Sequence, residues 1–197
     1  LSGLSGAWNR LCMDMCDASK AENIVLKSKS CSLDCSGASV ISGMSSISAD
    51  LLTLQQSGAT SLSFGKVQAG TVKADFSGAA KCSITDVDAG MIQAGLSGSS
   101  HLVASGKISS VSVDMSGASV MTLSGEGKTM NVVASGVSNL KSKDFRVKEA
   151  KLELSGAAGV VATVSDKIAV ETSGRAHVDY YGHPANVECR SDNVRER

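Results

Sequence analysis

The sequence predicts an all-β protein, a right-handed parallel β-helix of about nine coils with roughly 20 residues in each coil. Three observations favour this fold. A Ser-Gly dipeptide recurs about every twenty residues, apolar and polar residues alternate on both sides of it, and no segment keeps the period of a helix over three turns. A hexapeptide period, which a left-handed β-helix would show, is absent. A β-propeller would need about 40–50 residues per blade.

The composition agrees with one folded domain and argues against several other classes of protein. At 197 residues the chain is long enough to have its own core, and hydrophobic residues make up 42% of it. Its 19 Lys and Arg residues balance 19 Asp and Glu residues, so no electrostatic footprint for nucleic acid is expected. No run of eighteen apolar residues occurs, so no transmembrane segment is expected.

Ser-Gly dipeptides mark the expected corners between coils. Glycine reaches left-handed backbone conformations without steric cost, so it suits a tight corner. Each corner glycine follows a serine, and successive glycines are 18 to 21 residues apart. The corner glycines are Gly37, Gly58, Gly78, Gly98, Gly117, Gly136, Gly156 and Gly174.

The strand before each corner alternates apolar and polar side chains. In one copy, Val72, Ala74 and Phe76 alternate with Lys73 and Asp75. Side chains two residues apart lie on the same face of a strand, so we expect the apolar set to point inward and the polar set outward. Other copies have apolar residues at the same places: Cys31, Leu33, Cys35, Val111, Val113, Met115, Leu152, Leu154, Ile168 and Val170.

The strand after each corner has a small residue first and an apolar residue two places later. The second residue after each glycine is small, which a tightly curved coil accommodates: Ser39, Thr60, Ala80, Ser100, Ser119, Ser138, Ala158 and Ala176. The fourth residue is apolar and is expected to point inward: Ile41, Leu62, Cys82, Leu102, Met121, Leu140, Val160 and Val178. A third, weaker strand follows in segments such as 66–69, 85–89 and 107–109.

A further corner is hidden near the start of the chain. Residues 13–19 match residues 113–119, with Asp17 in the place of the corner glycine. Aspartate reaches the left-handed backbone region more readily than most residues with a side chain, so it suits this place. An alternative register uses Ser5-Gly6 as the first corner, with an insertion after it. We favour the register with Asp17.

The predicted coils form a single domain over residues 1–197. We expect an N-terminal cap or partial coil at residues 1–10, stacked coils at residues 11–180, and a charged C-terminal cap and tail at residues 181–197. A cap is needed because unpaired strands at the end of a stack invite aggregation. No signal peptide begins the printed sequence, and Leu1 is not a natural start, so an export signal or lipid anchor upstream stays open.

The six cysteines are the most chemically suggestive residues. The register points Cys31, Cys35 and Cys82 inward, where cysteine acts as a small hydrophobic residue, and leaves Cys12 and Cys16 outward. Four residues along a strand separate Cα atoms by about 13 Å, so no disulfide is expected between Cys12 and Cys16 or between Cys31 and Cys35. A disulfide between coils stays open. Neither a metal site nor a cofactor is predicted.

Acidic residues recur in the outward column next to the corners: Asp34, Asp75, Asp114, Glu153 and Glu171. Gln55, Gly95 and Val133 interrupt this column, so carboxylates seldom lie on adjacent coils. Three interpretations are open: a solvated face that discourages strand slippage, a surface for a cation or carbohydrate, and a catalytic groove. His101 and His177 share another outward column but lie about 19 Å apart, too far for a common site. No catalytic residue is predicted.

The corner motif and its flanks resemble a known bacterial family. The runs that carry the resemblance are 33–39 (LDCSGAS), 113–119 (VDMSGAS), 152–157 (LELSGA) and the closing 179–184 (DYYGHP). They are similar to the auto-transporter adhesin head, or GIN-domain, family of Bacteroides-like bacteria, over about residues 11–187. The resemblance implies a right-handed β-helical protein that is exported or surface-associated and acts in adhesion. It supplies no catalytic residues.

We therefore predict a non-enzymatic binding or adhesion module at the cell surface, in the periplasm or outside the cell. A glycan or a cell-envelope protein is the expected partner, contacted at several points by a rigid repetitive face. The expected contact residues are outward acids and the few candidate aromatics: Asp75, Asp114, Glu153, Glu171, Trp8, Tyr180 and Tyr181. The aromatic residues have an alternative role, which is to close the ends of the stack.

Two rival classes of function stay open. A β-helical carbohydrate-active lyase or hydrolase would bring three or more acids and bases together in one groove. A cytoskeletal scaffold like the bactofilins would polymerise end to end through uncapped apolar ends. The charged tail that ends at Arg197 counts against the scaffold.

Overall fold

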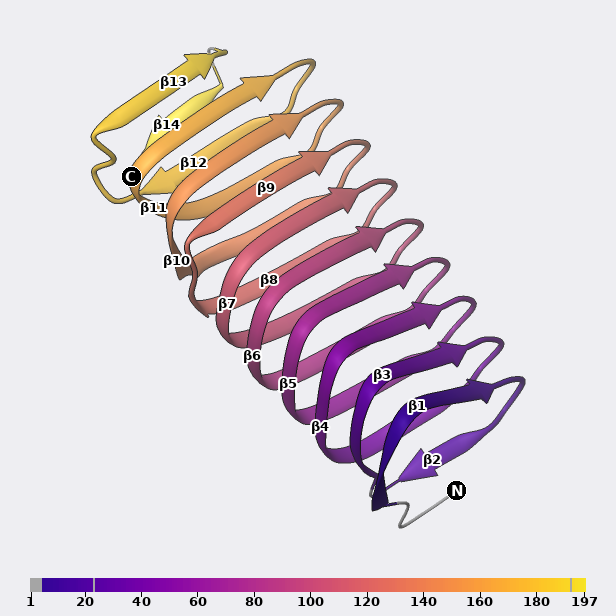
Figure 1. The fold of residues 1–197 in the computed structure, drawn as a ribbon. Helices are drawn as coiled ribbons and strands as arrows, with labels where there is room; N and C mark the ends of the chain where they lie inside the picture. The colour runs from indigo at the N-terminus through magenta and orange to yellow at the C-terminus, as the bar shows by residue number, and fades with distance from the viewer. Residues whose placement is uncertain (1–4, 23, 192) are drawn as a thin grey trace.

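The computed structural model describes residues 5–22, 24–191 and 193–197, so the first four residues of the expected N-terminal cap lie outside the described part. Every regular element in the described residues is a β-strand, and all strand pairs are parallel. The chain winds as a right-handed solenoid whose coils stack along one axis (Figure 1). The predicted fold class is confirmed.

The long strands combine the segment after one Ser-Gly corner with the segment before the next, because the backbone bends between them without leaving the sheet. The strands are β1 (Ser5–Met15), β2 (Lys20–Glu22), β3 (Val25–Cys35), β4 (Val40–Gln56), β5 (Ser61–Phe76), β6 (Lys81–Leu96), β7 (His101–Met115), β8 (Val120–Glu126), β9 (Thr129–Ala134), β10 (Asn139–Leu154), β11 (Gly159–Thr172), β12 (His177–Tyr181), β13 (Asn186–Arg190) and β14 (Val194–Glu196).

The solenoid has about ten turns, with equivalent residues about twenty positions apart. The prediction of about nine coils was based on the Ser-Gly corners and Asp17. The additional turn is formed by the charged tail, in which β13 pairs with β11 and β14 pairs with β12. The tail therefore continues the sheet on two sides as one short final coil.

Backbone hydrogen bonds between equivalent corners explain why Ser-Gly recurs. The amide of Ala118 donates to the carbonyl of Gly98 at 2.8 Å, and the other corners repeat this bond. The corner glycines have φ between 69° and 80°. This left-handed conformation is energetically unfavourable for a residue that has a side chain. The corner serines add a second donor: the hydroxyls of Ser77, Ser97 and Ser135 each donate to a carbonyl of the preceding coil at 3.3 Å.

Asp17 forms the first corner, as the favoured register predicted. It is the only described non-glycine residue with a positive φ, 58°, and its carbonyl accepts a hydrogen bond from Ala38 at 2.9 Å. The amide of Ser36 likewise donates to Met15 at 2.8 Å. These are the bonds that the Ser-Gly corners make, so residues 16–18 are a complete corner without glycine.

The core is a single column of apolar side chains inside the coils. The inward residues predicted on both sides of the corners are buried, and Phe64 and Phe145 are the largest of the fully buried side chains. The small residues next to the corners, from Ser39 to Ala176, are buried as well. This packing confirms the alternation of inward and outward side chains.

The cysteines lie where the register predicted. Cys31, Cys35 and Cys82 are buried in the core, whereas Cys12 and Cys16 are exposed, as is Cys189 in the final coil. All six are free thiols. Burial raises the pKa of Cys31 and of Cys35 to about 11 from an ordinary value of 9.0. The inward thiols therefore stay protonated and act as apolar packing groups.

Candidate functional site

One outward ladder runs along the whole solenoid beside the Ser-Gly corners. We call it the acid ladder, although it also holds other residues. Its members are aligned as Cα partners: Asp14, Asp34, Gln55, Asp75, Gly95, Asp114, Val133, Glu153, Glu171 and Arg190. Neighbouring strands in a sheet are about 4.8 Å apart, so the ladder presents side chains at that interval. The structure adds Asp14 and Arg190 to the predicted column.

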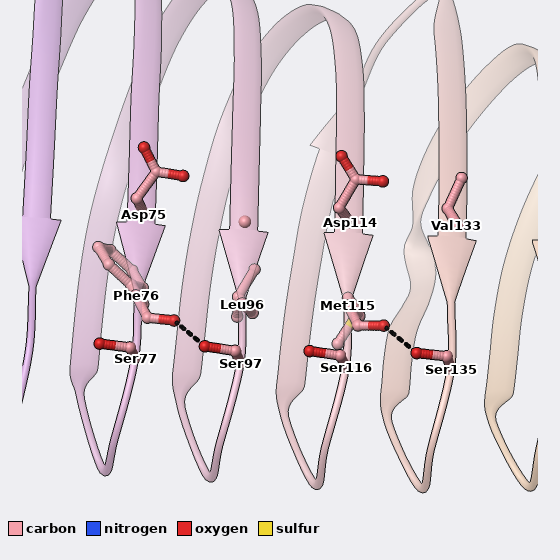
Figure 2. A pocket seen from close by; sticks show the side chains of 11 residues that line it. Asp75, Phe76, Ser77, Leu96, Ser97, Asp114, Met115, Ser116, Val133 and Ser135 are labelled. Carbon is pink, nitrogen blue, oxygen red and sulfur yellow. Dashed lines mark hydrogen bonds between the residues drawn. The ribbon is translucent and has the colours of Figure 1, made fainter.

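Gly95 interrupts the acid ladder and leaves a hollow between Asp75 and Asp114 (Figure 2). The two aspartates are two coils apart, a separation of about 10 Å between their Cα atoms. Asp75 leans into the space that a side chain at Gly95 would fill, because a Cβ there would lie 2.8 Å from its Oδ1. Both carboxylates are exposed. The structure thus brings two predicted contact residues to one site.

The hollow over Gly95 has a volume of about 470 Å³ and continues onto the corner serines. Figure 2 shows Ser97 donating to the carbonyl of Phe76 and Ser135 to that of Met115, each at 3.3 Å. These bonds fix the serine hydroxyls along the lower edge of the hollow. The site therefore offers two carboxylates above a row of oriented hydroxyl groups, on an open surface.

Glu153 and Glu171 lie on adjacent coils of the acid ladder, near its C-terminal end. Lys151 forms an ion pair with Glu153 at 2.7 Å, and this contact raises the pKa of the lysine. Arg190 is the next member of the ladder after Glu171. At this end the negative charges are accompanied by positive ones, so Glu153 and Glu171 form a different environment from Asp75 and Asp114.

The three predicted aromatic contact residues do not lie together. Trp8 is in β1, at the opposite end of the stack from Tyr180 and Tyr181 in β12 (Figure 1). The indole of Trp8 is partly buried against the core and covers Gly6, where a Cβ would lie 2.5 Å from two ring atoms. One binding site cannot contain all three side chains.

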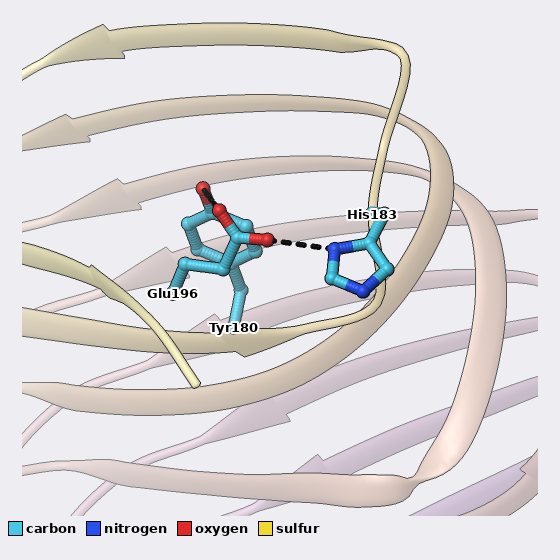
Figure 3. Close-up of polar contacts among 3 residues, drawn as sticks. All are labelled: Tyr180, His183 and Glu196. Carbon is cyan, nitrogen blue, oxygen red and sulfur yellow. Dashed lines mark hydrogen bonds and ion pairs between the residues drawn. The ribbon is translucent and has the colours of Figure 1, made fainter.

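Tyr180 lacks the exposed ring face that stacking on a sugar requires. It is 6% exposed, and its ring belongs to the core beneath the final coil. Figure 3 shows its hydroxyl beside Glu196, with Tyr180 Oη 3.3 Å from Glu196 Oε2 and His183 Nδ1 2.9 Å from Glu196 Oε1. Its position fits the alternative role named above, which is to close the end of the stack.

Tyr181 is half-buried, and the amine of Lys143 lies 4.6 Å from its ring centroid. This is a cation–π contact. The sequence pattern does not indicate Lys143 beside Tyr181 or Glu196 beside Tyr180, because Lys143 and Glu196 lie outside the repeated positions. Asp179 shows the same limitation, since it pairs with Arg197 of the tail at 3.3 Å.

The described residues contain no group of His, Cys, Asp and Glu that could hold a metal ion. They also contain no helix that is long and apolar enough to cross a membrane. His101 and His177 lie in one outward column on separate coils.

The arrangement defines a class of protein first: a parallel β-solenoid whose polar groups line straight ladders and open hollows. Comparison with family models matches residues 83–184, just over half of the chain, to the family described as "Putative auto-transporter adhesin, head GIN domain". The chain belongs to this family. No curated protein and no solved structure matches the chain.

Proposed function

We propose that this protein is a non-enzymatic adhesion module that acts at the cell surface or in the periplasm and holds a glycan or a protein partner on its outward ladders. Membership of the adhesin-head family supports the adhesion role. The observation that carries the proposal is the acid ladder, in which exposed groups from successive coils share one line. Such a line can contact a repetitive partner at several points at once.

The backbone supports this role by keeping the ladder rigid. Corner amides and carbonyls are hydrogen-bonded from coil to coil, and the strands between them are paired on both sides in the middle of the stack. A ligand that binds such a face loses its own freedom but does not have to order the protein, which lowers the free-energy cost of binding. Asp75, Asp114 and the hollow over Gly95 are the part of the ladder best shaped to receive a ligand.

The rival carbohydrate-active enzyme receives weaker support from the same hollow. Lys73 lines an adjoining hollow together with Asp75 and Asp114, but the two carboxylates stand on an open surface. Acid–base catalysis of glycosidic cleavage uses a carboxyl group that is buried or that has a like charge close beside it. Two exposed carboxylates about 10 Å apart at Cα do not provide either condition.

A printed glycan array and a bacterial cell-envelope fraction, probed with the fluorescently labelled chain, test the proposal. We expect binding to at least one glycan or envelope protein, and binding weakened at least about fivefold in the Asp75→Asn/Asp114→Asn double variant. Asp34→Asn is the matched control, because it changes the same ladder outside the hollow. Absence of binding to both probes would overturn the adhesion role, and release of reducing ends from a bound polysaccharide would favour the enzyme.

A further inference from the structure

A second and larger hollow lies on a different edge of the solenoid, where the chain turns from the strands after the Ser-Gly corners to the strands before the next ones. Its volume is about 620 Å³. We call it the Arg146 hollow. Its lining residues come from β8, β10 and β11 and from the turn after β12, and the polar ones that matter here are Glu126, Arg146, Lys148, Thr163, Ser165 and His183.

Irregular backbone opens the Arg146 hollow. The register of β10 shifts against β8 between Lys141 and Asp144, and against β11 between Ser142 and Arg146 and again between Val147 and Glu149. Such bulges re-aim side chains and are common beside binding sites. Gly127 and Gly182 line the same hollow, and Gly182 has a φ of 94°. A Cβ at Gly127 would lie 2.4 Å from the carbonyl oxygen of Ile108 and 2.9 Å from the Phe145 ring, so the backbone packs here too closely for a side chain.

Arg146 and Lys148 bring two positive charges to the Arg146 hollow, beside Glu126, which is the Cα partner of Arg146 on the neighbouring coil. Glu126 already pairs with Lys107 at 3.3 Å. In the part of the chain that the structure describes, neither Arg146 nor Lys148 has an ion-pair partner or a side-chain hydrogen bond. Both side chains are exposed. The hollow therefore presents two cations, Arg146 and Lys148, which have no ion-pair partner among the described residues and are two residues apart on one bulged strand.

The other groups at the Arg146 hollow are already oriented by neighbours. Thr163 donates to the carbonyl of Lys143 and Ser165 to the carboxylate of Asp166, each at 2.6 Å. His183 is held by Glu196 at 2.9 Å (Figure 3), which leaves its Nε2 edge unoccupied by that contact. Next to His183 in sequence stand Gly182 and Tyr181, the latter under the amine of Lys143.

We propose that the Arg146 hollow binds an anionic saccharide, a sugar unit that carries a carboxylate or sulfate group. The guanidinium of Arg146 can donate two parallel N–H bonds to such a group, and Lys148 adds a second charge beside it. The volume suits a sugar unit better than a bare inorganic ion, since small-molecule sites span about 300–1,000 Å³. This inference rests on the proposed adhesion function and names a ligand class for it.

Isothermal titration calorimetry with the purified protein of residues 1–197 tests the Arg146 hollow. The probes are a heparin tetrasaccharide for sulfate, tetragalacturonate for carboxylate, maltotetraose as the neutral saccharide, and inorganic phosphate. We expect at least one anionic tetrasaccharide to bind, with affinity that falls as salt rises, and maltotetraose and phosphate to bind at least tenfold more weakly. The preferred anionic probe identifies the charged group.

Matched variants locate the binding. Arg146→Ala should weaken the anionic tetrasaccharide about tenfold or more, and Arg146→Lys should weaken it less, because it keeps the charge but loses the paired donors. Lys27→Ala, which removes an exposed lysine near the other end of the stack, should leave binding unchanged. Circular dichroism checks that each variant is folded.

Three results would overturn the Arg146 proposal: Arg146→Ala binds like the unaltered chain, maltotetraose binds as tightly as the anionic tetrasaccharides, or phosphate alone competes at equal concentration. Failure of every tetrasaccharide would do so as well. The adhesion proposal fails separately, since it depends on the glycan array and envelope fraction. If the Arg146→Ala variant still binds the glycan array as the unaltered chain does, the Arg146 proposal is overturned and the adhesion proposal is retained.

Discussion

At the scale of single residues, the corner position shows why one aspartate is tolerated among glycines. A Cβ on the corner glycine would point at the preceding coil: at Gly117 it would lie 2.6 Å from the carbonyl oxygen of Gly98. Equivalent contacts recur at the other glycine corners. Asp17 is in the first described coil, so no described corner carbonyl lies against its Cβ. The position therefore needs a left-handed residue but not an absent side chain.

Alanine at two corners tests this explanation. Gly117→Ala should lower the free energy of unfolding by at least about 2 kcal/mol, because the side chain meets backbone and the left-handed conformation is strained. Asp17→Ala should cost less than about 1 kcal/mol, since a Cβ is already accommodated there. Urea unfolding followed by circular dichroism measures both values. Equal losses at the two corners would show that contact with the preceding coil is unimportant.

The buried thiols make stability depend on pH above neutrality. The pKa of Cys31 and of Cys35 is about 11 in the folded protein, against an ordinary 9.0. As the pH rises, these thiols lose their protons in the unfolded chain before they do so in the folded protein. Their contribution to the free energy of unfolding is therefore fully present below pH 9 and is lost as the pH rises toward 11. We expect the urea midpoint to fall over this window, and to fall less in a Cys31→Ala/Cys35→Ala variant. Parallel pH profiles of the two proteins would contradict the assignment.

At the scale of elements, the repeated parts of the coils were predictable and the unrepeated parts were not. Ser-Gly corners and inward columns recur in the sequence, so the strand segments of each coil and the buried Cys82 were predictable from spacing. The acid ladder followed for the same reason. The expected short strands, including the third ones at 66–69, 85–89 and 107–109, are joined in the structure into the long strands β5, β6 and β7. The hollow over Gly95 could not be predicted from the sequence, because the absence of a side chain at Gly95 leaves a hollow only if the residues on the neighbouring coils flank it.

No repeated pattern in the sequence marks the bulges of β10 or the strands of the tail. Arg146 and Lys148 have the pattern of ordinary surface charges, and only the register shifts of β10 show that they line one hollow. The tail has no Ser-Gly corner, and only three residues, 191–193, connect Arg190 to Val194. Its pairing with β11 and β12 depends on stacking against a preceding coil, which sequence periodicity does not reveal.

The final coil should protect the end of the sheet. β13 and β14 are short and carry Glu188, Arg190, Arg195 and Glu196, which are features that discourage edge-to-edge pairing. Deletion of residues 186–197 exposes the edges of β11 and β12. We expect the melting temperature to fall by about 5 °C or more and the truncated chain to self-associate in light scattering. Arg190→Ala, which keeps the coil, is the control, and a monomeric truncated chain of unchanged melting temperature would refute the role.

At the scale of the whole molecule, the solenoid separates two kinds of surface along one rigid body. The acid ladder with its hollow over Gly95 follows the Ser-Gly edge, and the Arg146 hollow lies on another edge near the C-terminal end. In a stack each coil contacts chiefly its neighbours, so a change in one hollow should leave the other intact. The losses of binding free energy caused by Asp75→Asn/Asp114→Asn and by Arg146→Ala, measured on the same glycan array, should therefore add up in the combined variant.

The ladders and both hollows exist only if successive coils are stacked in register, and electron–electron distances between spin labels test this stacking most directly. Ser32, Asn131, Lys151 and Ala169 belong to one outward ladder. With Cys12, Cys16 and Cys189 replaced by serine, a label at position 32 is paired in turn with one at 131, 151 or 169. Five, six and seven strand spacings predict narrow distributions near about 24, 29 and 34 Å. Distances that do not rise by one strand spacing per coil, or that are broadly distributed, would contradict the account.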